Sequence, residues 1–310
     1  MGETVATNRI QVVRATAWRD AVIKILEPRS PYRPWRIPAG IKRGDAVLVV
    51  LETNPVSVIA DIREVGVDGS ALRALARFLD SGLPWREPPA LLELATLRAL
   101  TGFSLPDDGD PATVLGRAAL TTAIGQRQAA PSGGDYLDGH TSLAAAAILL
   151  VSLGRCTGCG DKLGLAAADA RDRLHIRSVD LAPSQRRVPV ADDPPEEPRR
   201  LSQQGYGPDD IRIGVWRPGR FPTDWPAVLC DTCHGRMQHG GFDSFLRLRF
   251  SLHPPCPSCA AQWTMRTYAG FAAVLRSEPW MFHTGCCPRR IWVCAACGHE
   301  WGPSSDPEAG

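Results

Sequence analysis

The sequence lacks any long apolar run. No stretch of about 18 or more apolar residues occurs, and the longest predominantly apolar segment, residues 143–153, is too short to span a bilayer. Residues 1–10 also lack the basic start and the apolar core of a secretory signal. We therefore expect a cytoplasmic protein without a membrane partner.

A strong charge excess is absent as well. The chain has 35 Lys and Arg against 33 Asp and Glu, a net charge of +2, which does not by itself indicate a polyanionic partner. Basic residues do gather locally within residues 29–43, beside Tyr32 and Trp35. Such arginines are most often solvated surface residues, but next to aromatic side chains they leave phosphate binding open.

Cysteine is absent before Cys156, and all ten cysteines lie between there and Cys297. Without a secretion signal, so many cysteines favour metal ligation over disulfides. A two-residue spacer lets both thiolates of a Cys-x-x-Cys pair reach one ion, so four pairs predict two structural Zn²⁺ ions in tetrahedral sites. A redox dithiol is the alternative for any single pair. The pairs are Cys156/Cys159, Cys230/Cys233, Cys256/Cys259 and Cys294/Cys297.

Spacing leaves the sharing of ions between the pairs open. Cys230/Cys233 could complete a site with Cys156/Cys159 or, across residues 234–255, with Cys256/Cys259. The two remaining cysteines, Cys286 and Cys287, are adjacent, and neighbouring thiolates do not easily face one ion. One of them could serve as an alternative ligand of a zinc site, and the other interpretation is a buried thiol.

The pattern of the chain is that of an α+β protein with three regions. Residues 1–130 contain no cysteine, residues 131–250 hold two pairs and a Pro-rich insertion near residues 182–208, and residues 251–310 hold the other two pairs. Turn signals and apolar spacing predict the elements between them. The predicted strands are residues 21–26, 46–51, 56–65, 173–179 and 211–216, and the predicted helices are residues 70–80, 89–100 and 142–153.

Residues 34–65 carry a first resemblance to a known group. The segment Pro34-Trp35-Arg36-Ile37-Pro38, the turn Lys42-Arg43-Gly44-Asp45 and the two apolar strands that follow resemble the PUA-like superfamily, in particular EVE domains. The resemblance implies an N-terminal PUA-like β-barrel that reads a modified base. It further implies that Trp35 and Trp18 wall the base pocket and that Arg36, Lys42 and Arg43 contact nucleic acid. A tryptophan in a small barrel is, however, more often part of the core.

A second resemblance begins at the first two cysteine pairs. A helix, Cys156-Thr157-Gly158-Cys159, a strand, and later Leu229-Cys230-Asp231-Thr232-Cys233-His234 resemble zinc-stabilised HNH endonucleases. The resemblance implies an HNH-like treble-clef ββα core in which these two pairs share one ion. Segments Ser178-Val179-Asp180 and Gly205-Tyr206 resemble one branch of that family.

The HNH resemblance also assigns a catalytic set. It implies that His234 and Asp180 bind Mg²⁺ or another divalent ion, which polarises the scissile phosphate while a histidine deprotonates water. The family's histidine is missing, because Leu181 follows Asp180. His175 could serve as the base in a different strand register, and the alternative is a surface histidine on an edge strand.

The last two pairs resemble a zinc ribbon. Each is followed by a tryptophan four residues on, Trp263 after Cys259 and Trp301 after Cys297. Together the three resemblances imply a DNA-directed, HNH-type nuclease of modification-dependent restriction, acting as a homodimer if it cuts both strands. The alternatives are a catalytically inactive nucleic-acid-binding protein and a zinc-stabilised protein-interaction subunit of a defence or mobile-element complex.

Overall fold

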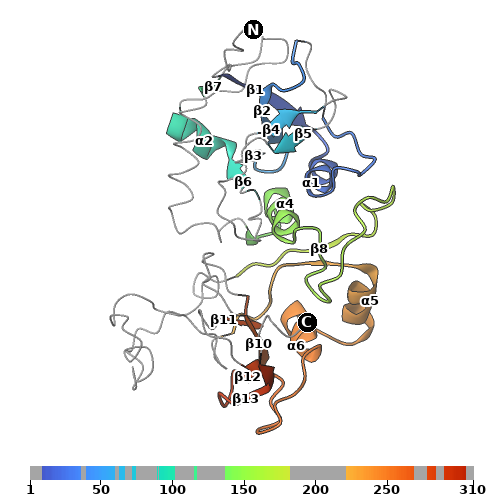
Figure 1. Ribbon diagram of the computed structural model, residues 1–310, viewed down its shortest axis with the longest axis vertical. Coiled ribbons are helices and arrows are strands. Elements are labelled where there is room, and N and C mark those ends of the chain that lie inside the picture. The colour runs from blue at the N-terminus through green and yellow to red at the C-terminus, as the bar shows by residue number, and fades with distance from the viewer. Residues whose placement is uncertain are drawn as a thin grey trace. The chain divides into compact units, whose positions relative to one another are not determined.

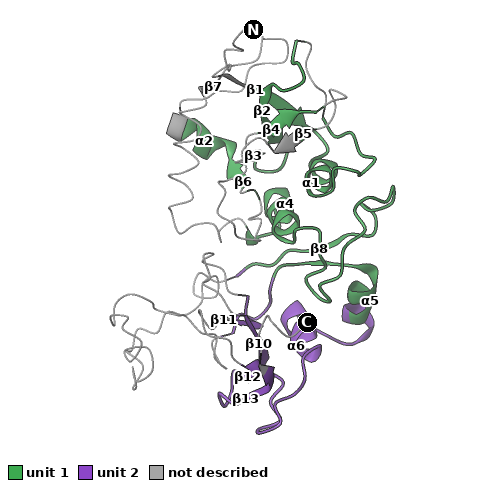
Figure 2. Cartoon of the chain, viewed as in Figure 1, with its two compact units in different colours: residues 1–180, 226–236 green, residues 181–225, 237–310 purple. Residues whose placement is uncertain are grey.

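The computed structural model shows a mixed α+β protein with three β-sheets and two four-cysteine clusters (Figure 1). The chain divides into two compact units, residues 1–180 with 226–236 and residues 181–225 with 237–310 (Figure 2). The residues that the structure describes are 9–35, 40–59, 63–66, 72–74, 89, 91–101, 115–116, 137–181, 221–268, 278–283 and 290–304. The insertion predicted near residues 182–208, the strand predicted at residues 211–216 and the pair Cys286/Cys287 lie outside them. The three-region division of the chain stays a prediction.

A seven-stranded sheet forms the N-terminal part of the first unit. Its central strand β2 (Ala46–Leu51) is almost continuously apolar and buried, as expected for a strand covered on both faces. β2 pairs in parallel with β1 (Arg9–Ala15) and antiparallel with the next two strands. Those two strands are β3 (Ser57–Ile59) and β4 (Arg63–Val65). The remaining three strands of the sheet are β5 (Leu72–Ala74), β6 (Leu91–Glu93) and β7 (Leu115–Gly116). The path runs from β5 to β7 without closing, so the described strands form no closed barrel.

Helices α1 (Trp18–Leu26), α2 (Leu94–Thr101) and α4 (Ser142–Val151) complete this part. α4 is apolar on nearly all sides and buried, which is possible because it contacts α1 as well as the small hairpin of β8 (His175–Arg177) and β9 (Ala227–Leu229). Its first turn is capped by Thr141 Oγ1, which accepts a hydrogen bond from the Ala144 N–H at 3.1 Å. The backbone N–H of Asn54 also donates to Ser142 Oγ at 2.6 Å. α4 thus connects the N-terminal sheet to the four-cysteine segment of the same unit.

The four-cysteine segment of the first unit consists of a cysteine turn, a hairpin and a helix. β8 (His175–Arg177) pairs antiparallel with β9 (Ala227–Leu229), and α5 (Asp231–His239) follows directly. The backbone of Thr157 in the turn is held to β9, because its N–H donates to Val228 O at 2.8 Å. In return the Val228 N–H donates to Thr157 Oγ1 at 3.0 Å. These bonds bring residues more than 70 positions apart into one site.

The second unit combines a short helix, α6 (Phe245–Ser251), with a four-stranded sheet of order β11-β10-β12-β13. The strands are β10 (Thr264–Tyr268), β11 (Met281–His283), β12 (Arg290–Cys294) and β13 (Glu300–Ser304). Its core is aromatic: the rings of Phe245 and Trp225 both meet the buried Trp280 edge-on. Such contacts add to the energy of area burial and give this small unit a core.

Three predicted elements differ from the structure. Residues 21–26, predicted as a strand, belong to helix α1, which starts at Trp18 and buries the consecutive apolar residues Ala21, Val22 and Ile23 over a wide part of its surface. Within the helix predicted at residues 70–80, Leu72–Ala74 is strand β5 paired with β4. The helix predicted at residues 89–100 begins only at Leu94, after strand β6. No described helix is both long and apolar enough to cross a membrane.

Candidate metal centres and an adjacent histidine pair

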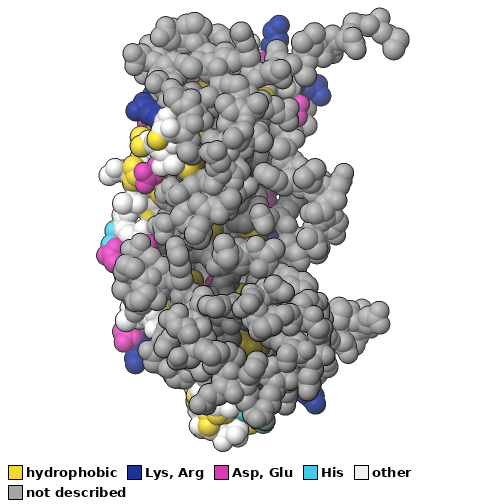
Figure 3. Space-filling view, turned by 90° about the vertical axis from the view of Figure 1, so that its left-hand side faces the viewer, with side chains coloured by type: hydrophobic (Ala, Val, Ile, Leu, Met, Phe, Trp, Pro, Cys, Tyr) yellow, Lys and Arg dark blue, Asp and Glu magenta, His cyan; other side chains and the backbone are white. Residues whose placement is uncertain are grey.

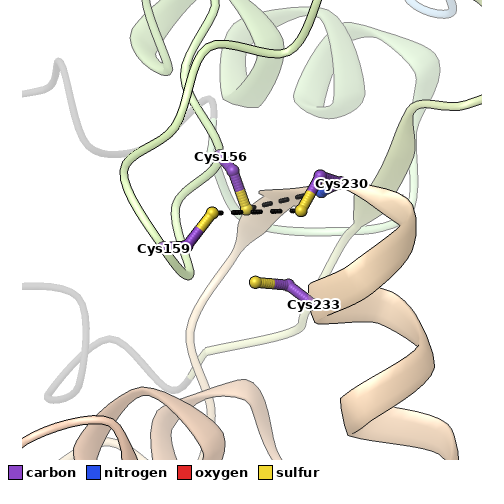
Figure 4. Close-up of side chains that lie close together, drawn as sticks. All are labelled: Cys156, Cys159, Cys230 and Cys233. Atoms are coloured by element: carbon purple, nitrogen blue, oxygen red, sulfur yellow. Dashed lines mark hydrogen bonds between the residues drawn. The ribbon is translucent and has the colours of Figure 1, made fainter.

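The first cluster consists of Cys156, Cys159, Cys230 and Cys233, whose sulfur atoms all lie within 4.8 Å of one another (Figure 4). The first two come from the turn after α4 and the other two from the start of α5. A tetrahedral Zn²⁺ with Zn–S bonds of about 2.3 Å requires sulfurs about 3.8 Å apart. The distance between Cys159 Sγ and Cys230 Sγ is 3.9 Å, close to this value, so the cluster is consistent with a tetrahedral Zn²⁺.

Backbone groups orient the first cluster. The Gly160 N–H donates to Cys156 O and the Cys156 N–H to Asp161 O, both at 2.8 Å, which closes the turn around the thiolates. The Cys230 N–H donates to Cys156 Sγ at 3.4 Å. Gly158 has no room for a side chain, because an added Cβ would lie 2.9 Å from Cys233 Sγ. The sequence Cys-Thr-Gly-Cys therefore matches the space that the four sulfurs leave.

The thiols of the first cluster do not all ionise readily without a cation. Burial opposes ionisation of Cys156, but N–H groups of Cys230, Cys159 and Gly158 outweigh it and lower the pKa of this thiol. Burial and the neighbouring Cys156 thiolate raise the pKa of Cys233. Burial likewise raises the pKa of Cys159, to about 12. A bound divalent cation supplies the charge that four adjacent thiolates require.

The second cluster consists of Cys256, Cys259, Cys294 and Cys297 and lies in the second unit. Its sulfurs are 3.7 Å apart between Cys256 and Cys297 and 3.6 Å apart between Cys259 and Cys294, again close to the tetrahedral value. Both halves are the same kind of turn, with the N–H of residue 260 or 298 donating to the first cysteine's carbonyl at 2.9 Å. The two clusters are consistent with two structural Zn²⁺ ions, as the cysteine spacing predicts.

The pKa values of the second cluster again differ between its members. Burial opposes ionisation of Cys256, but N–H groups of Cys259 and Ser258 outweigh it and lower the pKa to about 7. The neighbouring Cys259 has a pKa raised to about 12, since hydrogen bonds to the other thiols outweigh the effect of the Ala261 N–H. The Cys256 thiol therefore ionises readily and can bind a cation, whereas the cation itself must displace the proton of Cys259.

A histidine pair, His175 and His234, lies beside the first cluster. Their rings stack with centroids 3.8 Å apart and planes 2° from parallel. His175 Nε2 also lies 2.8 Å from Asp231 Oδ1 in the first turn of α5. The strand register explains the contact between His175 and Asp231, because His175 pairs with Leu229, two residues before Asp231. Burial, and then the neighbouring His175, lower the pKa of His234.

The structure separates Asp180 from this pair. Asp180 Oδ2 lies 3.2 Å from His140 Nε2, and both side chains are largely exposed. Among the described residues, the groups of three or more side chains able to share an ion are the two cysteine clusters, so Asp180, His175 and His234 form no such group. Sequence reasoning missed Asp231. The feature that could have identified Asp231 is its place in the first turn of the helix that also carries His234.

The residues predicted to contact nucleic acid lie at the N-terminal sheet. Trp35 is only 5% exposed and bridges to Ala15, which places it in the core. Lys42 and Arg43 are exposed in the turn before β2, and Arg36 lies outside the described residues. The other predicted wall, Trp18, is half-buried with the Arg19 guanidinium 5.6 Å from its ring centroid. On the side drawn in Figure 3, the described Lys and Arg side chains stand singly instead of forming a broad basic patch.

Comparison of the chain with models of protein families, with curated proteins and with solved structures gives no match. The functional interpretation therefore depends on the chain's own geometry.

Proposed function

We propose that the protein is a DNA-directed, zinc-stabilised nuclease of the HNH type. The observation that carries this proposal is the histidine pair beside the first cluster, with Asp231 next to it. The surrounding segment has the order of a treble clef: a cysteine turn, a hairpin and a helix that supplies the last two ligands. Such a frame fixes the residues that follow its cysteines, so His234 is held by its neighbour Cys233.

The donor atoms at the histidine pair suit the chemistry of phosphodiester cleavage. His234 offers an imidazole nitrogen to a divalent cation, while His175, oriented by Asp231, offers a nitrogen that can take a proton from water. No third ligand is close enough to complete a cage within the described residues. An imidazole ligand suits Ni²⁺ and related transition metals, and Mg²⁺ at this place would keep several waters and the substrate phosphate as its other ligands. The cation would polarise the phosphate and stabilise the leaving oxygen.

The roles of these side chains follow from their attachment. His234 belongs to a helix anchored by two cysteines of a zinc site, which makes its position rigid. His175 belongs to a three-residue strand, and its hydrogen bond to Asp231 fixes its ring orientation and tautomer. Asp180 is an alternative cation ligand only if its contact with His140 is given up.

A nicking assay tests the proposal. Supercoiled plasmid is incubated with the zinc-loaded chain and Mg²⁺, Mn²⁺ or Ni²⁺, and conversion to open-circular and linear DNA is followed on gels. We expect His234→Ala to abolish nicking while zinc content and melting temperature are unchanged. His239→Ala is the matched control, because His239 lies on the same helix, is exposed and should not affect cleavage.

The second candidate function is DNA binding without cleavage. It is favoured by the separation of Asp180 from the histidine pair, which leaves the family's cation ligands apart. If the chain binds DNA but no divalent ion supports nicking, this second function replaces the first. If His234→Ala nicks as the wild type does, the activity belongs to another site or to a contaminant.

The N-terminal sheet would supply recognition of a modified base under the same proposal. The support is the exposed turn with Lys42 and Arg43, together with the half-buried Trp18. The burial of Trp35 argues that this residue stabilises the sheet and does not stack on a base. Binding of duplexes that differ only by cytosine methylation tests this part, and equal affinities for both would remove the reader function.

A further inference from the structure

One face of the four-stranded sheet in the second unit carries aromatic and cationic side chains in a row. Arg266 on β10 pairs directly with Trp292 on β12, and Trp292 pairs with Trp301 on β13. Directly opposite residues of antiparallel strands share a face. Tyr268, two residues after Arg266, joins the same face, and the Arg266 guanidinium lies 5.8 Å from its ring centroid. His299 stacks on Trp301 with centroids 5.8 Å apart and planes 15° from parallel.

We call Tyr268, Arg266, Trp292, Trp301 and His299 the aromatic–arginine face. Alternation along the strands places Met265, Thr267 and Val293 on the opposite face, and all three are buried. Arg266 and His299 are exposed, and the three larger rings are half-buried. Trp292 rests partly against the buried His253, at a centroid distance of 4.8 Å. His253 thus covers part of Trp292, while Arg266 and His299 at the edges of the row remain exposed.

The charge of this face is positive. Among the residues of the four strands, the only carboxylate is Glu300. Glu300 pairs with Val293 and so belongs to the buried side of the sheet. Arg290, exposed at the start of β12, adds a second guanidinium near the row. Aromatic rings interleaved with cations on one sheet face suit a partner with flat rings and negative charge.

We propose that the aromatic–arginine face binds single-stranded nucleic acid, with unpaired bases stacked on Trp301 and Trp292 and a phosphate at Arg266. Adjacent strands lie about 4.8 Å apart, so the three side chains span a distance comparable to two or three nucleotides. Duplex DNA is the poorer partner because its bases hide their faces and a net charge of +2 provides few phosphate contacts. This inference does not depend on cleavage at the histidine pair.

Fluorescence anisotropy with the full zinc-loaded chain tests the proposal. The probes are a labelled single-stranded oligonucleotide of about 20 nucleotides, its duplex, and a labelled poly-glutamate peptide of similar length, at low salt and without added Mg²⁺. We expect the single strand to bind most tightly. Trp301→Leu should weaken this binding about 5- to 150-fold by removing one stacking partner, whereas Trp301→Phe should retain most of it.

Matched variants distinguish the contributions of charge, folding and cleavage to single-strand binding. Arg266→Gln should weaken single-strand binding and reduce its salt dependence, while Arg247→Ala, an exposed arginine on α6 paired with Asp243, should have no effect. Two zinc ions per chain must be retained in each variant. The assay contains no added Mg²⁺ and measures binding alone, so failure of the nuclease proposal leaves this test intact. An equal loss of duplex and single-strand binding in Trp301→Leu, unchanged single-strand binding in that variant, or tighter binding of the peptide would overturn the proposal.

Discussion

Two glycines at the first cluster should respond in opposite directions to the same substitution. Gly158 lies between the cysteines of the first turn, and a Cβ there would be 2.9 Å from Cys233 Sγ and 3.2 Å from Cys233 Cβ. Gly235 lies in helix α5, and a Cβ there meets no atom within 4 Å. The pair thus isolates the effect of space around the zinc ligands.

The magnitudes follow from these contacts. A carbon and a sulfur normally stay more than 3 Å apart, so Gly158→Ala forces the Cys233 thiolate to move by several tenths of an ångström. Zinc sites tolerate distance errors of about 0.2 Å, and overpacking of a full site costs about 1–3 kcal/mol. We expect zinc affinity at this site to fall about 5- to 150-fold. Gly235→Ala should stabilise the protein by about 0.5–1 kcal/mol, because alanine is the better helix former.

The assay is competition for zinc. A chromogenic chelator is titrated against each variant, and the release of one ion per chain at lower chelator concentration identifies the weakened site. Thermal melting of the zinc-loaded proteins gives the accompanying change in stability. Gly158→Ala with wild-type zinc affinity would refute the packing that we describe around Cys233, and a destabilised Gly235→Ala would show that α5 is constrained by contacts beyond those seen.

Three further predictions concern local stability. Ala260 has a left-handed backbone (φ 57°) where the equivalent turns have Gly160 and Gly298, so Ala260→Gly should raise the melting temperature through relief of up to about 1 kcal/mol of strain. Thr141→Ala should destabilise the first unit by about 1 kcal/mol in urea unfolding, because α4 loses its N-cap. Burial lowers the pKa of His253 to about 4, so the folded protein favours the neutral ring. The free energy of unfolding should therefore fall by up to about 3 kcal/mol as the pH decreases from about 6.5 to 4. In unfolding titrations of the zinc-loaded protein at pH 7 and 5, His253→Gln should show a smaller loss than the wild type.

The neutral state of His253 has a direct structural cause. Its ring is 5% exposed, with Nδ1 2.6 Å from Thr264 O and Nε2 2.8 Å from Arg249 Nη1. The carbonyl requires a donor at Nδ1 and the guanidinium requires an acceptor at Nε2, which only the neutral ring with Nδ1–H provides. A proton added at Nε2 would face the arginine, so acid should break this contact first.

The cysteine pattern was informative because coordination chemistry acts locally. A Cys-x-x-Cys turn brings two sulfurs together whatever the rest of the chain does, so the eight ligands could be predicted from spacing. Which pairs share an ion could not, because that depends on the fold that brings two turns together. Helix α1 was not predicted, since Ala21, Val22 and Ile23 read equally well as a buried strand and no side chain caps the N-terminus of the helix. Short apolar runs of this kind are decided by packing, here against α4.

The sequence named His234 and His175 as candidates, but it could not indicate that their rings stack or that His175 contacts Asp231. His175 and Asp231 are 56 residues apart, and their contact depends on the register of β8 against β9. A shift of one residue would turn His175 to the other face of the hairpin. The pairing of Ile176 with Val228 and of Arg177 with Ala227 continues that register, which the sequence does not reveal.

Loss of zinc from the first cluster and from the second cluster should have different effects on the surrounding structure. The second is built from two equivalent turns, whereas the first ends in a helix whose residues Asp231 and His234 alternate with its cysteines. Loss of the first ion should therefore loosen α5 and separate the two histidine rings, which stack at 3.8 Å. Cys230→Ser and Cys297→Ser should each lower zinc content by one ion per chain. Only Cys230→Ser should shift the imidazole signals of His175 and His234 in NMR spectra, and equal shifts in both variants would contradict a specific role of the first cluster in holding the histidine pair.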